Sequence, residues 1–139
     1  MLRPCRNLAT SGFARSFSRK NTLKPWERTE AKAALDAFVA EHYRPQLKEP
    51  PKNSEFNYAV DLTTRWHGPY LYIRAKYACP SPLAVTPFFE RDFVRLGVVF
   101  ANKWNLWARR YNDEWLCLEE DLTLQQCFQR MRTDAWFEF

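Results

Sequence analysis

The side chains with the clearest potential for chemistry lie in residues 102–115, which read NKWNLWARRYNDEW. The stretch holds three tryptophans, a tyrosine and two arginines. Such residues can form a surface that stacks nucleic-acid bases, the wall of a catalytic pocket, or the inside of a small sheet. The choice among these depends on which side chains share a face.

Catalytic patterns elsewhere are weak. Glu90 and Asp92 share a strand face and, with Lys103, have the residue types of an acid–acid–lysine nuclease centre that binds a divalent metal. Solvent-facing sides of strands carry such charges routinely, so this hydrolase hypothesis ranks last. The acidic run 119–121 is expected to supply charge to the start of a helix. With no nucleophile elbow, glycine-rich phosphate loop or H-E-x-x-H motif present, we expect no catalytic residue.

Cysteine and histidine spacing does not indicate a metal site. No two cysteines form C-x-x-C, and no histidine lies at ligand spacing from a cysteine or from the other histidine. We therefore expect neither a metal nor a cofactor. The residues concerned are Cys5, Cys79, Cys117, Cys127, His42 and His67.

Positive charge is confined to the start of the chain. Six of the 21 Lys and Arg residues, and none of the 16 Asp and Glu residues, lie in residues 1–24. The formal charge of +5 thus belongs to this segment, and the remainder is close to neutral. A neutral body has no general excess with which to attract a polyanion.

The leader MLRPCRNLATSGFARSFSRKN is rich in Arg and Ser and lacks acids, which is typical of a mitochondrial transit peptide. Arg15 lies three residues before a potential matrix-protease cut after Phe17. We expect localisation in the mitochondrial matrix, or in the cytoplasm if residues 1–24 are only a disordered basic segment. No apolar run approaches the roughly 20 residues of a membrane span, so no transmembrane segment is expected.

Residues 25–139 are predicted to form one domain. A helix should begin near Pro25 and end before Pro45, with Leu35 and Phe38 on its apolar face and His42 packed at the rim. A second helix should follow Thr123, because Gln126 stands three residues later, as a capping box requires.

Five strands are expected between these helices. Alternating side chains predict the first two strands, FNYAVDLT and YLYIRAKYA, separated by a turn at RWHGP. In the first of them, Phe56, Tyr58, Val60 and Leu62 are expected to share one face. FFERDFVRLGVVF, WNLWARR and WLCLE follow with short connections, which favours an antiparallel meander. The predicted fold class is α+β, a five-stranded antiparallel β-meander with both helices packed on one face.

Strand alternation divides the aromatic side chains between the two faces. Trp104 shares one face with Leu106, whereas Trp107 shares the other with Arg109. Trp115 can lie on either face, depending on register. The predicted binding surface comprises Tyr70, Tyr72, Arg74, Trp107 and Arg109.

The pattern Trp, any residue, Leu, aromatic, with a second Trp eleven positions after the first, resembles the C-terminal half of a family of small bacterial proteins of unknown function. Its other features are similar to ALDAFVAEHYRP, CPSPLAVTPFFERDFVRL and DAWFEF here. The resemblance spans about residues 30–139 and implies the same order of elements. It implies no catalytic residue, cofactor or substrate.

Two functions fit this pattern better than hydrolysis. The first is a small non-enzymatic interaction or accessory module that docks on a larger mitochondrial protein or ribonucleoprotein assembly. The second is a single-stranded RNA-binding protein that uses the aromatic and basic sheet face. The sequence does not predict the oligomeric state.

Overall fold

The computed structural model describes residues 23–47, 56–100 and 102–139. Of the segment predicted to be a targeting peptide, only Leu23 and Lys24 belong to these described residues. In the described part of the chain, no helix combines the length and the hydropathy needed to cross a bilayer.

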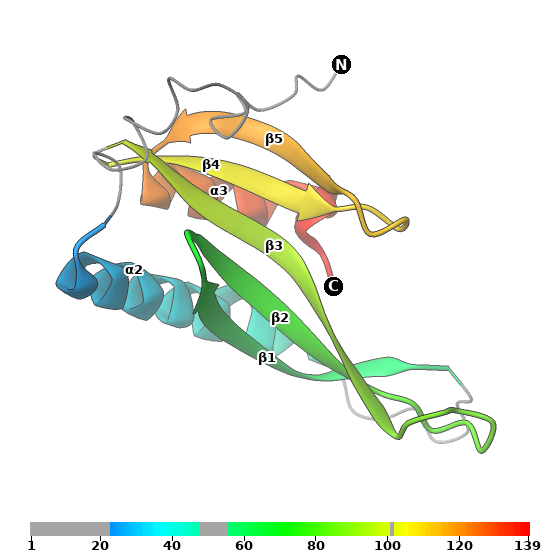
Figure 1. The fold of residues 1–139 in the computed structure, drawn as a ribbon. Coiled ribbons are helices and arrows are strands. Elements are labelled where there is room, and N and C mark those ends of the chain that lie inside the picture. The colour runs from blue at the N-terminus through cyan, green and yellow to red at the C-terminus, as the bar shows by residue number, and fades with distance from the viewer. Residues whose placement is uncertain (1–22, 48–55, 101) are drawn as a thin grey trace.

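Five strands form one antiparallel sheet in the order of the sequence, as predicted. Each strand pairs only with its neighbours along the chain, so the sheet is a meander (Figure 1). The strands are β1 (Tyr58–His67), β2 (Tyr70–Ala78), β3 (Phe88–Phe100), β4 (Lys103–Arg109) and β5 (Trp115–Leu122).

Helical segments at both ends of the described chain cover the same face of this sheet, which confirms the predicted α+β class (Figure 1). The first is α2 (Pro25–Phe38), which continues through a π turn, η1 (Val39–Tyr43), into a short 3₁₀ turn, η2 (Arg44–Gln46). The second is α3 (Leu124–Thr133), followed by the 3₁₀ turn η3 (Ala135–Phe137). The predicted end before Pro45 was wrong: Arg44 keeps helical dihedral angles (φ −59°, ψ −38°), and the 3₁₀ turn includes Pro45 and ends at Gln46.

The predicted capping box at the start of α3 is present. The backbone N–H of Gln126 donates to Oγ1 of Thr123 over 3.2 Å, and the backbone N–H of Thr123 donates to Oε1 of Gln126 over 2.8 Å. These bonds satisfy donors that a helix start otherwise leaves without partners. They place Cys127, Phe128 and Met131 against the sheet, where all three are buried.

The core lies between the sheet and the helices. It includes side chains with no exposed area on the three central strands and on α2: Leu71, Ile73, Val94, Leu96, Leu106 and Leu35. Tyr43 is also buried, and its hydroxyl donates to the backbone carbonyl of Phe137 over 2.7 Å. This bond joins the two helical ends of the fold across the core.

The predicted pattern of the first strand was wrong. A register irregularity between Ala59 and Asp61 leaves Val60 exposed, and the core face begins only at Leu62. Residues 65–67, predicted as part of the turn, continue β1. The turn consists of Gly68 and Pro69, and Gly68 has φ 58°, a conformation that glycine adopts without strain.

The hairpin of β2 and β3 extends past the helices into an exposed tip (Figure 1). Its loop, residues 79–87, carries Leu83 and Val85, which are 91% and 100% exposed. Phe88 and Phe89 at the start of β3 are also exposed, although Phe89 stacks on Tyr77 with 4.9 Å between ring centroids. The tip therefore adds little to the core.

Candidate recognition surface

The predicted binding residues share the sheet face that points away from the helices, which we call the outer face. Tyr70, Tyr72 and Arg74 reach it from β2, and Trp107 and Arg109 reach it from β4. β3 lies between these strands and pairs Tyr72 with Arg95, which in turn pairs with Trp107. The sheet thus gathers residues that are more than 30 positions apart in the sequence.

Four aromatic rings on the outer face form a contiguous aromatic cluster: Tyr70, Tyr72, Trp107 and Trp115. Tyr70 and Trp107 meet edge to face, with 5.5 Å between ring centroids and an interplanar angle of 82°. Tyr72 lies 6.3 Å from Tyr70 and 5.7 Å from Trp115. Edge-to-face contacts of this kind add about 0.5–1.5 kcal/mol beyond the burial of area, so the rings hold each other in place.

Gly97, toward the end of β3, makes room for this cluster. A Cβ atom at this position would lie 2.9 Å from two atoms of the Tyr70 ring and 3.0 Å from the Trp107 ring. These separations are too short for ordinary van der Waals contact. Glycine therefore allows rings from β2 and β4 to meet over β3.

Arg95 lies at the middle of the aromatic cluster. Its guanidinium carbon is 4.3 Å from the ring centroid of Tyr70, 4.5 Å from that of Trp107 and 5.0 Å from that of Trp115. The attraction of a cation to the electron-rich ring faces favours this position. Among the residues that the structure describes, Arg95 makes no ion pair.

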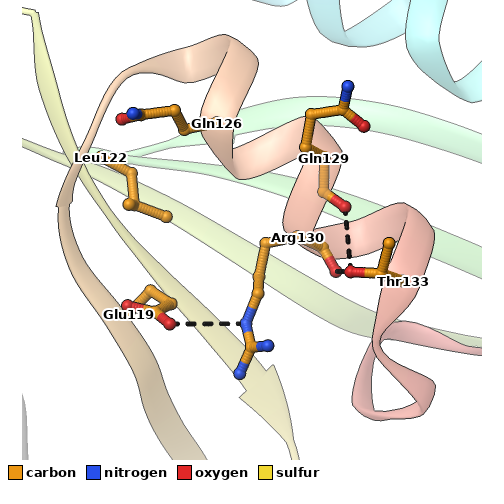
Figure 2. Close-up of a pocket in the computed structure, with 6 residues that line it drawn as sticks. All are labelled: Glu119, Leu122, Gln126, Gln129, Arg130 and Thr133. Atoms are coloured by element: carbon orange, nitrogen blue, oxygen red, sulfur yellow. Dashed lines mark hydrogen bonds and ion pairs between the residues drawn. The ribbon is translucent and has the colours of Figure 1, made fainter.

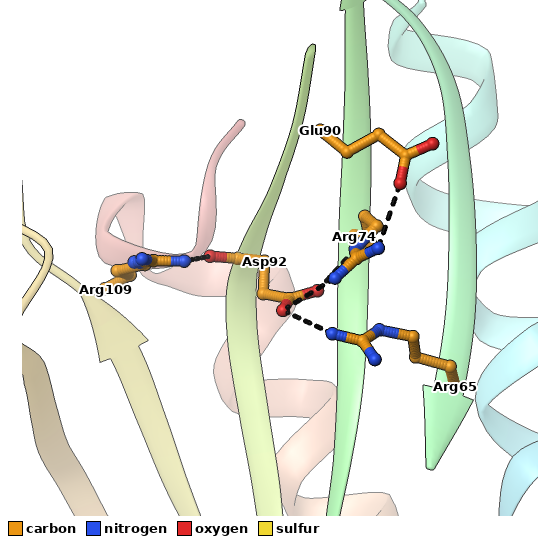
Figure 3. A network of polar contacts seen from close by, with 5 residues as sticks. All are labelled: Arg65, Arg74, Glu90, Asp92 and Arg109. Atoms are coloured by element: carbon orange, nitrogen blue, oxygen red, sulfur yellow. Dashed lines mark hydrogen bonds and ion pairs between the residues drawn. The ribbon is translucent and has the colours of Figure 1, made fainter. Parts of the chain in front are cut away.

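Arg65 and Arg74 on the outer face are paired with carboxylates, as Figure 3 shows. The Asp92 side chain, only 12% exposed, accepts from Nη2 of Arg65 over 3.1 Å and from Nε of Arg74 over 3.0 Å. Arg74 also pairs with Glu90 over 2.9 Å, and Nη1 of Arg109 donates to the Asp92 carbonyl over 3.2 Å. Arg74, although predicted to bind a partner, is thus neutralised within the sheet.

Two members of this surface, Arg95 and Trp115, could not be assigned to it from the sequence. β2 and β3 pair with an irregularity at Phe93, so that Phe93 points into the core while Asp92 and Arg95 both reach the outer face. Trp115 pairs with Arg109 and is therefore on the outer face rather than in the core. Simple alternation cannot reveal an extra residue in a strand.

The residues of the hydrolase hypothesis are not brought together. Glu90 lies near the start of β3, whereas Lys103 pairs with Phe100 at its far end. At the usual rise of about 3.3 Å per strand residue, roughly 30 Å separates them. Within the described residues, no group of three or more His, Cys, Asp or Glu side chains is arranged to hold a metal.

A shallow groove between β5 and α3 is lined by Leu122 and by polar side chains that already have partners (Figure 2). Nε of Arg130 lies 3.6 Å from Oε1 of Glu119, and its Nη2 lies 2.9 Å from Oδ2 of Asp134. The Thr133 hydroxyl donates to the backbone carbonyl of Gln129 over 3.2 Å. These contacts stabilise the end of α3 and leave the outer face as the stronger candidate.

His42 packs at the rim of the helical layer, as expected. Its ring stacks on Phe38 with 5.3 Å between centroids. Burial, assisted by the positive charge of Arg132, lowers the pKa of His42 below its usual value. The neutral imidazole is therefore the form that suits this position.

Comparison with known protein families identifies the family of this chain. Residues 21–138 match the family described as "Domain of unknown function (DUF3024)". No curated protein and no solved structure matches the chain.

Proposed function

This chain belongs to the DUF3024 family, whose description assigns no activity, and from its surface we propose that it is a small non-enzymatic interaction module. In this proposal the outer face docks on a larger protein or ribonucleoprotein assembly. The aromatic cluster and Arg95 form the centre of the contact.

The arrangement around Arg95 carries the proposal. Trp, Tyr and Arg are the residue types that contribute most of the binding energy at protein interfaces. Here two tryptophans, two tyrosines and an arginine contact one another from four strands, and all five are only partly buried. Because their rings already brace each other, binding would order few additional side chains.

Single-stranded RNA is the second candidate partner. Aromatic rings beside arginines are the usual platform for unpaired bases, where each stacked base contributes about 1–3 kcal/mol. Glu90 and Asp92 lie among the arginines of the outer face, however, and would repel the phosphate backbone. We therefore place a protein partner first.

Co-purification of the tagged full chain from its native cells tests the proposal. We expect a defined assembly that survives nuclease treatment and is lost with Trp107→Ala. Trp136→Ala is the matched control, because Trp136 is a 44% exposed tryptophan on η3, outside the outer face. An assembly that dissociates on nuclease treatment would favour RNA binding. If both variants retained the assembly equally, the outer face would be excluded as the docking surface.

We also propose that the chain acts in the mitochondrial matrix, because its basic, acid-free leader has the composition of a transit peptide. A fluorescent protein fused to residues 1–24 should enter mitochondria. The same fusion with Arg15 and Arg19 changed to Gln should remain outside. Uniform cytoplasmic signal from the unaltered fusion would contradict this localisation.

A further inference from the structure

We infer that Arg95, together with Arg109, binds carboxylates of an acidic segment in the partner protein. The inference rests on the proposed docking function and specifies the chemistry of its partner. Three features of the outer face support it. Arg95 lacks a carboxylate partner among the described residues, it shares the ring of Trp115 with Arg109, and Arg74 nearby already binds a carboxylate.

Arg95 has an unused capacity to donate hydrogen bonds. A guanidinium that stacks on rings uses its flat faces and keeps its N–H groups at its edge. Within the described residues, Arg95 contacts three rings and has no acidic partner. A carboxylate at this edge would complete the pairing of the charge.

The ring of Trp115 lies close to two positively charged guanidinium groups. The guanidinium of Arg95 is 5.0 Å from its ring centroid, and that of Arg109 is 5.5 Å from the same centroid. Arg109 has a single described carboxylate partner, Asp113, at 3.4 Å, and the Asp113 side chain is 68% exposed. Such an exposed pair contributes little, so an anion that reaches both arginines would relieve their mutual repulsion.

The same face shows how its arginines bind carboxylates. Arg74 contacts Asp92 through two nitrogens, with Nε 3.0 Å from Oδ1 and Nη2 3.4 Å from Oδ2. Two-point binding of this kind matches the fork of a guanidinium to the two oxygens of a carboxylate. Among the described residues, Arg65, Arg74 and Arg109 each contact a carboxylate, whereas Arg95 contacts none.

An acidic peptide fits this surface better than a nucleic acid. Asp92 and Glu90 would oppose a continuous line of phosphates, whereas a peptide can place one or two carboxylates between them. Tyr70 and Trp107 meet at 82° and so do not offer coplanar ring faces to successive bases. Beyond residue 24 the chain has slightly more acidic than basic residues, so recognition of either partner would depend on local contacts rather than on an overall excess of positive charge.

Fluorescence anisotropy with a labelled decamer of glutamate tests the inference on the full chain at low salt. We expect saturable binding that weakens at least tenfold in Arg95→Gln, the cost of losing a hydrogen-bonded charge partner. Arg95→Lys should weaken binding to an intermediate extent, because an ammonium keeps the charge but lacks the planar fork. Thermal unfolding establishes whether each variant remains folded. If Arg95→Gln does not fold, the affinity of Arg95→Lys tests the inference.

Arg28→Gln is the matched control. Arg28 lies 4.3 Å from the Trp66 ring centroid, so it offers a similar arginine–tryptophan contact, but it belongs to α2 on the covered side. Its substitution should change affinity for the glutamate decamer by less than twofold. An equal loss in Arg28→Gln and Arg95→Gln would reveal a general charge effect and overturn the inference.

A labelled thymidine dodecamer separates the two classes of partner. Tighter binding of this oligonucleotide than of the glutamate decamer, with dependence on Arg95, would overturn the acidic-segment inference in favour of nucleic acid. Absence of peptide binding, or binding indifferent to Arg95→Gln, would also overturn it. If the native assembly is lost with Trp107→Ala but kept with folded Arg95→Gln, docking stands and only the acidic segment fails.

Discussion

The two faces of the sheet carry different kinds of side chain, and different interactions order them. On the covered face, apolar residues such as Leu71 and Leu106 are fully buried against the helices. On the outer face, rings alternate with arginines and remain partly exposed. Burial of apolar area stabilises the first face, whereas mutual bracing and ion pairs order the second. The contrast predicts that substitutions can change stability and the proposed recognition separately.

The adjacent residues Leu106 and Trp107 give the sharpest test of that separation. Leu106→Ala should lower the free energy of unfolding by about 2–5 kcal/mol, because it leaves a cavity in the core. Trp107→Ala should lower it by at most about 2 kcal/mol, because the ring is half-buried and the rest of its cluster can adjust. Urea denaturation measures both values, and equal losses would contradict the division between the faces.

Asp92 tests whether ion pairs order the outer face. Asp92→Asn should cost about 1–3 kcal/mol of unfolding free energy, because a largely buried carboxylate that binds Arg65 and Arg74 is lost. Glu90→Gln is the matched control and should cost less than about 1 kcal/mol, since Glu90 makes one pair and its side chain is 48% exposed. If both changes were neutral, the network would not be a structural element.

The smallest expected effect concerns the edge of the covered face. Because the fold lowers the pKa of His42, the unfolded chain binds a proton more readily than the folded protein does. The resulting stability is fully present above pH 6.5 and is lost as the pH falls through the lowered pKa. His42→Phe, which keeps a ring beside Phe38, should reduce the loss of stability between pH 7 and 5.

Arg132→Gln serves as the partial counterpart of that change. It removes one cause of the lowered pKa and leaves burial in place, so the pH dependence should shrink only in part. Thermal unfolding midpoints across the pH range measure both variants. If the unfolding midpoint of His42→Phe depended on pH as strongly as that of the wild type, other groups would determine stability in acid.

Much of the covered face follows from local rules. The alternation in YLYIRAKYA places Leu71, Ile73 and Ala75 together, and the capping box at Thr123 sets the start of α3. The outer face depends on register, which local patterns do not determine. The extra residue at Phe93 is what brings Arg95 to the aromatic cluster, and the pairing of Trp115 with Arg109 decides the side on which Trp115 lies.

The ion pairs of the outer face, by contrast, cannot be read from the sequence pattern. Tyr70, Tyr72, Arg74, Trp107 and Arg109 were predicted as one surface, and they do share a face. Their pairing could not be foreseen, because Asp92 is adjacent to Arg74 only after β2 and β3 have aligned. Charge counted along a chain therefore overstates the charge that a folded surface presents.

The bond between Tyr43 and Phe137 has a consequence for the order of folding. Every strand pair of the meander joins neighbours in sequence, and such local pairs close short loops and form rapidly. Tyr43 and Phe137 are 94 positions apart, so their contact closes one of the longest loops in the described part of the chain. We expect the hairpins to form early, and the docking of the two chain ends to be the late step of refolding.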